Sequence, residues 1–196
     1  MPTPRSGPGA AAVLLLLALA PSLAAATLPR KATDFTIQLT NGHQVALSQF
    51  QGKVRAVIFI LTYCPHCQKT IGFLGKDQAE FGPRGFQVLA SAIEDMARQA
   101  LPDFLKRFGP PFPVGYNARG PVIDFLQHPI AARFIMPQLV LIDRQGMIRA
   151  QYAGDDPFMT NETQQEAGLR GKIEELLKEG PPAAPAHRTP HHSKKS

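Results

Sequence analysis

The chain has 196 residues, 44% of them hydrophobic, which is enough for one well-packed domain but too little for two large ones. Its formal net charge is +6, yet no basic face with interleaved aromatic residues is apparent, so nothing indicates nucleic-acid binding. Only two cysteines are present, which argues against a structural zinc site, because such sites usually take four ligands from two cysteine pairs.

Residues 1–26 have the pattern of a secretory signal peptide. Arg5 supplies the positively charged start, residues 10–20 form an apolar core, and residues 24–26 are alanines suited to cleavage. The apolar core is too short to span a bilayer, although an uncleaved membrane anchor remains the alternative. Both interpretations place the following domain outside the cytosol, where a disulfide can persist. We therefore expect a periplasmic or otherwise secreted protein.

Two short stretches with alternating polarity come next. Residues 34–39 and 44–47 alternate polar and apolar side chains on either side of Asn41-Gly42, a strong turn signal, which predicts an N-terminal β-hairpin. Residues 54–61, interrupted only by Arg55, form the continuous apolar run of a strand buried on both faces.

That strand leads into Cys64-Pro65-His66-Cys67, at the start of a helix predicted over about 65–81. Two residues between the cysteines let the sulfurs approach bonding distance without unwinding the chain. Cys64 is the candidate nucleophile, because the helix N-terminus stabilises a thiolate. Cys67, one turn further along, is the candidate resolving thiol. Pro65 suits the first turn, and a protonated His66 would favour the reduced form and tune the potential. A structural disulfide or half of a zinc site is the alternative.

A second apolar run, residues 86–93, completes a β-α-β unit of the length that a parallel right-handed crossover requires. Glu94 and Asp95 follow it directly. Sites in open α/β sheets assemble at the carboxyl ends of the strands, so we expect both acids to lie near the cysteines.

The middle of the chain has the features of an insertion beyond a minimal core. Apolar residues from Leu101 to Phe108 have helical spacing, and residues 109–113 break that pattern. A short strand over 114–116 and a short helix over 120–126 complete this expected central insertion.

The last third predicts an antiparallel strand pair and a final helix. Met136-Pro137 precedes a strand over 139–142, and a turn joins it to a strand over 147–153. The Met136-Pro137 bond is a candidate cis peptide. A helix over about 162–179 should cap one face of the sheet. We expect the domain to occupy residues 27–179, followed by a disordered Pro/Ala/basic tail over 180–196.

These residues together resemble a known family, the thioredoxin-fold thiol-disulfide oxidoreductases of the TlpA-like and redoxin type. The resemblance covers about residues 31–177. It is carried, in chain order, by Asp34-Phe35-Thr36, Gln51-Gly52-Lys53, Cys64-Pro65-His66-Cys67, Phe112-Pro113-Val114, Pro137 and the hairpin at 141–146. It implies an α/β, thioredoxin-like fold: a central mixed sheet flanked by helices, with an N-terminal β-hairpin and a central insertion.

The resemblance also implies roles for residues around the thiols. Glu94 falls where some extracytoplasmic members keep an acidic residue, and Met136-Pro137 matches the family's cis-proline, which presents backbone to an extended substrate. The chain departs from the family at Tyr63, where tryptophan is common, and at His66. With histidine there, the motif is identical to that of the oxidising DsbA-type enzymes.

The leading functional hypothesis is an extracytoplasmic oxidoreductase that exchanges disulfides with protein cysteines and depends on an upstream redox partner. We expect a monomer that needs no cofactor or metal and touches a membrane only if residues 1–26 are retained. A peroxiredoxin-like peroxidase is an alternative, but Thr62 stands two residues before Cys64, not three. A copper-handling chaperone is another, with His128 as the available distal histidine.

Overall fold

A computed structural model describes residues 27–180. The predicted signal peptide (1–26) and all but the first residue of the predicted tail (180–196) lie outside the described residues. Within residues 27–180, no helix is both long and apolar enough to cross a membrane.

The described residues form eight strands and five α-helices, with two 3₁₀ turns, η1 and η2. The strands are β1 (Arg30–Lys31), β2 (Thr36–Gln38), β3 (Gln44–Ala46), β4 (Val54–Ile60), β5 (Phe86–Ala92), β6 (Val114–Tyr116), β7 (Gln138–Ile142) and β8 (Met147–Tyr152). The helical elements are η1 (Leu47–Phe50), α1 (Pro65–Phe81), η2 (Gly82–Arg84), α2 (Ala97–Phe108), α3 (Arg119–Leu126), α4 (Pro157–Thr160) and α5 (Glu162–Lys178).

All eight strands belong to one mixed sheet, in the order β1-β8-β7-β4-β5-β6-β2-β3. The pairs β4·β5 and β5·β6 are parallel, whereas the remaining neighbours are antiparallel. This arrangement confirms the predicted β-α-β unit, the N-terminal hairpin and the antiparallel pair at the end of the chain. It also shows that β6, within the expected central insertion, is part of the sheet and joins the hairpin to β5.

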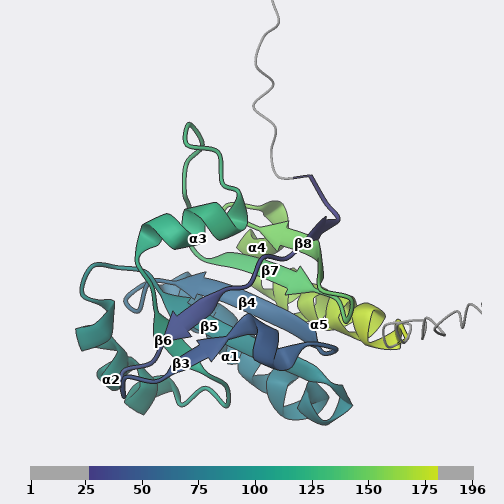
Figure 1. The fold of residues 1–196 in the computed structure, drawn as a ribbon, viewed down its shortest axis with the longest axis horizontal. Helices are drawn as coiled ribbons and strands as arrows, with labels where there is room; N and C mark the ends of the chain where they lie inside the picture. The colour runs from purple at the N-terminus through teal and green to yellow at the C-terminus, as the bar shows by residue number, and fades with distance from the viewer. Residues whose placement is uncertain (1–26, 181–196) are drawn as a thin grey trace, which may run out of the picture.

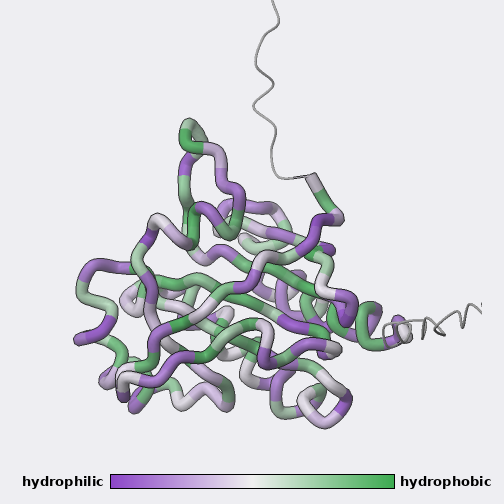
Figure 2. Tube along the Cα trace, in the orientation of Figure 1, coloured by the Kyte–Doolittle hydropathy of each residue, from purple (hydrophilic) through white to green (hydrophobic). Residues whose placement is uncertain are grey.

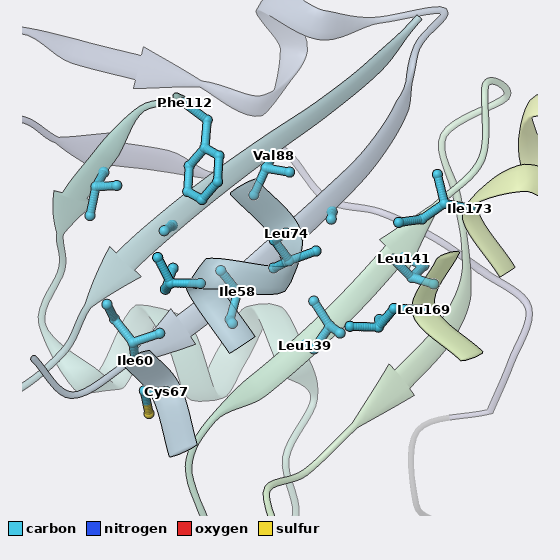
Figure 3. Packing of buried hydrophobic residues seen from close by; sticks show 14 of the residues in the cluster. Ile58, Ile60, Cys67, Leu74, Val88, Phe112, Leu139, Leu141, Leu169 and Ile173 are labelled. Carbon is cyan, nitrogen blue, oxygen red and sulfur yellow. The ribbon is translucent and has the colours of Figure 1, made fainter. Parts of the chain in front are cut away.

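Helices cover the sheet on both faces (Figure 1), and buried apolar residues form two clusters, one on each face. On one face, α1, α2 and α5 pack against the sheet, and Leu169 and Ile173 of α5 face Leu139 and Leu141 of β7 (Figure 3). On the other face, α3 packs together with the hairpin. Every residue of β4 is buried, and the central strands are correspondingly hydrophobic (Figure 2). Burial of about 25 cal/mol per Å² of apolar surface on both faces stabilises this three-layer arrangement.

Glycine permits the close approach that attaches the hairpin to the sheet. A Cβ atom at Gly115 of β6 would collide with the carbonyl oxygen of Gln38 in β2. The two strands meet there through the antiparallel pair Gln38 and Tyr116. A side chain at Gly115 would therefore separate the hairpin from the rest of the sheet.

Some features have no counterpart in the sequence-based prediction. The two-residue strand β1 pairs with β8 through Arg30 opposite Ile148, and the short helix α4 precedes α5. Asp156 caps α4 by accepting a hydrogen bond from the backbone N–H of Phe158 at 2.8 Å. Asn161 caps α5 in the same way, by accepting from the N–H of Gln164 at 3.1 Å.

Asp77 is a carboxyl group in an apolar position on α1. It lines the same surface hollow as Glu166 and Arg170 of α5, and the residue is 5% exposed. Burial raises the pKa of Asp77 to about 6; Arg170 opposes this shift, while Glu166 and Glu80 add to it. The carboxylate therefore destabilises the packed α1·α5 pair at neutral pH.

Replacing Asp77 with asparagine should change how stability depends on pH. The raised pKa in the folded state adds stability that is complete below about pH 4 and lost as the pH rises through about 6. A shift of about two units corresponds to up to about 3 kcal/mol. In urea unfolding between pH 4 and pH 7.5, Asp77→Asn should remove this decline and stabilise the protein at pH 7.5. The exposed Asp103 on α2 provides a matched control, because Asp103→Asn should leave the decline in place; equal effects of the two variants would contradict the assignment.

Candidate active site

Cys64 and Cys67 lie where β4 gives way to α1. Cys64 has extended backbone angles and is the N-cap residue of α1, with Pro65 as the first helical residue. The backbone N–H of Cys67 donates to the Sγ of Cys64 at 3.4 Å. The sulfur thus occupies the place in which a capping oxygen satisfies a free N–H of the first turn. A negative charge on this sulfur is favoured by the same N–H group and by the helix dipole.

The two thiols differ sharply in their surroundings. Both cysteines are free; Cys64 is half-buried, whereas Cys67 is fully buried in the core cluster beside Ile60 (Figure 3). Burial raises the pKa of the Cys67 thiol far above its usual range, and its hydrogen bond with Cys64 and the charge of Glu94 add to the increase. Cys67 therefore holds its proton, while Cys64 is only partly buried.

Glu94 reaches this region from the carboxyl end of β5, as predicted from the β-α-β unit. The parallel strands place Ala92 beside Ile60. Oε1 of Glu94 accepts a hydrogen bond from the backbone N–H of Thr62 at 3.0 Å and another from the Thr62 hydroxyl. Its Oε2 atom is buried and makes no hydrogen bond within the described residues. Asp95, the next residue, is exposed at the surface.

Tyr63 and His66 border Cys64 but differ in their orientation. Tyr63 is 69% exposed and presents an aromatic surface next to the half-buried thiol. His66 lines a small cavity of about 220 Å³ together with Lys69, Thr160 and Glu162. Its Nε2 atom is buried without a partner, and no hydrogen bond in residues 27–180 joins the ring to either sulfur. The imidazole thus faces the junction of α4 and α5.

The Met136-Pro137 peptide bond is cis, which confirms that prediction. It immediately precedes β7, in which Gln138 pairs with Phe59 near the carboxyl end of β4. Pro137 therefore lies at the sheet edge from which α1 starts. Met136 packs against both apolar clusters and holds this turn in place.

Thr62 and Gly154 support the site but were missed by sequence reasoning. Thr62 binds Glu94 as described, and its carbonyl oxygen accepts from Nε2 of Gln68 at 2.8 Å. Gly154 lies against the Met136-Pro137 backbone, where a Cβ atom would collide with the carbonyl group of Met136. The only sequence signal for this contact is a glycine immediately after a strand.

Within residues 27–180, no three histidine, cysteine or acidic side chains gather as a metal site would require. His128, the histidine considered for a copper site, packs edge-on against Phe134, and its Nδ1 lies 3.0 Å from the carbonyl oxygen of Pro129.

Proteins that are similar to this chain include thiol-disulfide oxidoreductases. The chain is 28% identical over 93 residues to the thiol-disulfide oxidoreductase ResA of Bacillus subtilis (strain 168), which is 47% of this chain and 51% of that protein. It is 26% identical over 125 residues to ResA of Geobacillus kaustophilus (strain HTA426), covering 63% of this chain and 67% of that protein. The first match thus spans about half the length of the curated relative.

Two solved structures from Chlorobium tepidum share the fold. One is a protein provisionally named thiol:disulfide interchange protein DsbE, with a TM-score of 0.64 and 26% identity over 76% of this chain and 96% of that chain. The other is a thiol:disulfide interchange protein of the thioredoxin family, with a TM-score of 0.64 and 20% identity over 78% of this chain and 99% of that chain. The fold is therefore thioredoxin-like, as the sequence predicted.

A profile of the family described as Redoxin matches residues 28–168, which include both cysteines, Glu94 and Pro137. That region contains all of the strands and the first four α-helices. With its thioredoxin-like fold and a dithiol at the start of α1, this chain belongs to the Redoxin family.

Proposed function

We propose that this protein is an extracytoplasmic thiol-disulfide oxidoreductase that exchanges disulfides with protein cysteines through Cys64 and Cys67. The observation that carries the proposal is the asymmetry of the two thiols. Cys64 is half-buried and caps α1, whereas Cys67 is fully buried and its pKa is raised. Such a pair suits a two-step exchange in which one thiol meets the substrate and the other completes the reaction.

In the reducing direction, the Cys64 thiolate attacks one sulfur of a substrate disulfide. The attacked sulfur stays bonded to Cys64 in a mixed disulfide, and the other sulfur of the substrate disulfide leaves as a thiolate. Cys67 then loses its proton, and its thiolate attacks the Cys64 sulfur, which releases the second substrate thiolate and leaves an enzyme disulfide. Two electrons pass from the enzyme to the substrate, and the oxidising direction is the reverse.

Deprotonation of Cys67 is the step that burial makes difficult. Glu94 has one carboxylate oxygen held by Thr62 and a second buried oxygen without a partner in the described residues. Its charge raises the pKa of Cys67. A carboxylate so placed keeps Cys67 protonated until the mixed disulfide forms, and it is the acidic group available to accept the proton.

We propose that the substrate binds at the surface around Cys64. Tyr63 offers an exposed aromatic ring, and Met136-Pro137 offers backbone at the same edge of the sheet. An extended substrate segment could pair with that backbone while its cysteine meets Cys64. The signal-like sequence of residues 1–26 supports action outside the cytosol, where a separate redox partner would restore the dithiol or the disulfide.

Trapping with serine variants tests the order of the two thiols. Cys67→Ser should accumulate mixed disulfides with protein substrates, because Cys64 still attacks but nothing resolves the product. Cys64→Ser should trap none, because its remaining thiol is buried. Non-reducing gels of both variants mixed with a disulfide-containing protein measure the difference. Equal trapping by the two variants would contradict the ordered mechanism.

A second test addresses the influence of Glu94 on Cys67. In a Cys64→Ser background Cys67 is the only thiol, so the pH dependence of its alkylation by a reagent much smaller than a protein, such as iodoacetamide, reports how readily it loses its proton. Glu94→Gln should lower the pKa of Cys67 and raise the alkylation rate at pH 8 by up to about tenfold, which corresponds to one pKa unit. Asp95→Asn removes the neighbouring, exposed carboxylate and should leave the rate unchanged. A larger effect from Asp95→Asn would remove Glu94 from the mechanism.

A third test concerns the reduction potential, which we expect to lie between about −270 mV for thioredoxin and about −120 mV for DsbA. A protonated His66 in the first turn would favour the Cys64 thiolate, and therefore His66→Gln should lower the potential by about 30 mV, or about 1.4 kcal/mol. Equilibration with glutathione measures this change. His43→Gln, in the exposed hairpin turn, is the control, and equal potentials for all three proteins would make His66 a passive residue.

A further inference from the structure

A cationic cavity of about 400 Å³ lies at the end of the sheet opposite the cysteines. It is formed by β1, the loop before β4 and the turn between β7 and β8, and its charged lining residues are Lys31, Arg55, Arg144 and Asp34. Arg55 is the second residue of β4, whereas Cys64 comes four residues after the last one, Ile60. The strand between them spans roughly 17 Å, so this cavity is separate from the proposed active site.

Arg55 is a buried cation without a direct ion pair in the described residues. The residue is 4% exposed, and no ion pair to it is found within residues 27–180. Its guanidinium makes only long hydrogen bonds, from Nη1 to the carbonyl oxygen of Leu47 at 3.4 Å and from Nη2 to that of Asp143 at 3.3 Å. Its Nε is buried and unpartnered. The Asp143 carboxylate pairs with Arg149 instead, at 3.1 Å. Burial lowers the pKa of Arg55, and the nearby carboxylates of Asp143 and Asp34 only partly offset this effect. A buried charge without a direct ion pair is costly, and an anion bound at this position would reduce that cost.

Two further cations line the same cavity and are also held by carbonyl groups. Arg144 donates from Nη1 to Gly52 at 3.2 Å and from Nη2 to Arg84 at 3.0 Å, and its Nε is buried without a partner. Lys31 donates from Nζ to the carbonyl oxygen of Gln145 at 3.0 Å. These contacts hold both side chains in place without neutralising their charges.

Asp34 is the one acidic residue in the lining, and its oxygens already have partners. Oδ1 accepts from the backbone N–H of Ser48 at 2.9 Å, and Oδ2 accepts from the Ser48 hydroxyl at 2.8 Å. Three cations and one carboxylate leave the described lining with a net charge of +2. That charge matches an anion with two negative charges.

Gly146 shows where two of the cations converge. It has a φ of +82°, and a Cβ atom built there would lie 3.2 Å from Nζ of Lys31 and 3.4 Å from Nη2 of Arg55. The absence of a side chain at Gly146 therefore leaves free a position that lies close to both cations. A planar guanidinium and an ammonium that meet at one point suit the tetrahedral oxygens of a phosphate group.

We propose that this cavity binds a small molecule or headgroup carrying a phosphate group, held between Arg55 and Lys31 with Arg144 at its side. Its volume falls within the range of about 300–1,000 Å³ typical of small-molecule sites, so the phosphate can carry a substituent. The inference does not depend on the proposed redox function, because none of these residues belongs to the thiol site.

Thermal unfolding of the full chain tests this site. Inorganic phosphate, compared with sodium chloride at equal ionic strength, should raise the melting temperature saturably, since a ligand of the folded state stabilises it by mass action. Lys31→Gln should weaken phosphate binding about tenfold or more, as expected for loss of a charged hydrogen bond. Arg55→Met should abolish the effect. Lys106→Gln, an equal charge change on the exposed face of α2, should preserve it.

Further ligands identify the source of the phosphate. Glycerol phosphate tests for a soluble phosphate ester. Vesicles containing phosphatidate, compared with vesicles of phosphatidylcholine alone, test for a lipid headgroup. Saturable binding to one of these probes also supports the site if Lys31→Gln weakens it. The proposal is overturned if none of these probes acts saturably, or if Lys31→Gln and Lys106→Gln weaken the effect equally. If Arg55→Met fails to fold, the comparison between Lys31→Gln and Lys106→Gln still tests the proposal, because both lysines lie at the surface. Insulin reduction by the same variants should be unchanged, which keeps this test separate from that of the thiol site.

Discussion

Burial of β4 on both faces fixes the position of the two cysteines, which follow the carboxyl end of this central strand. The strand lies between β7 and β5, with an apolar layer on each side, so it has no freedom to slide or tilt. A shift in register by one residue would exchange its two buried faces, at a cost of several fully buried side chains. The position of β4 therefore determines where the residues from Thr62 to the first turn of α1 lie. The neighbouring ends of β5 and β7 carry Glu94 and Pro137 to the same edge.

Charge inside this protein is distributed unevenly between the two ends of the sheet. At the carboxyl end of β4, Glu94 and the Cys67 thiol share a buried environment in which added negative charge is disfavoured. At the opposite end, Arg55 is buried beside Lys31 and Arg144, with the carboxylates of Asp34 and Asp143 nearby. Both arrangements cost free energy that a purely structural site would avoid, and the broad apolar core offsets that cost. Such concentrations of charge are typical of functional sites.

Much of the fold could be predicted because its periodic patterns are strong. The apolar runs that became β4 and β5, the helix after Cys64 and the turn at Gly42 each carry a local signal that agrees with the global fold. The burial of Arg55 and Asp77 could not be predicted from the sequence. A single charged residue in an apolar pattern is expected at the surface until the packing around it is known. β1 has only two polar residues, and its pairing with β8 depends on contacts more than 100 residues away in the sequence. The contact of Gly154 with Met136 is of the same non-local kind.

The two edges of the sheet are very short. β1 has two residues and β3 has three, so each edge offers few unpaired N–H and C=O groups to another chain. Short edges give another extended chain few backbone groups with which to pair. The sheet is therefore difficult to lengthen from either side, which limits aggregation through strand addition.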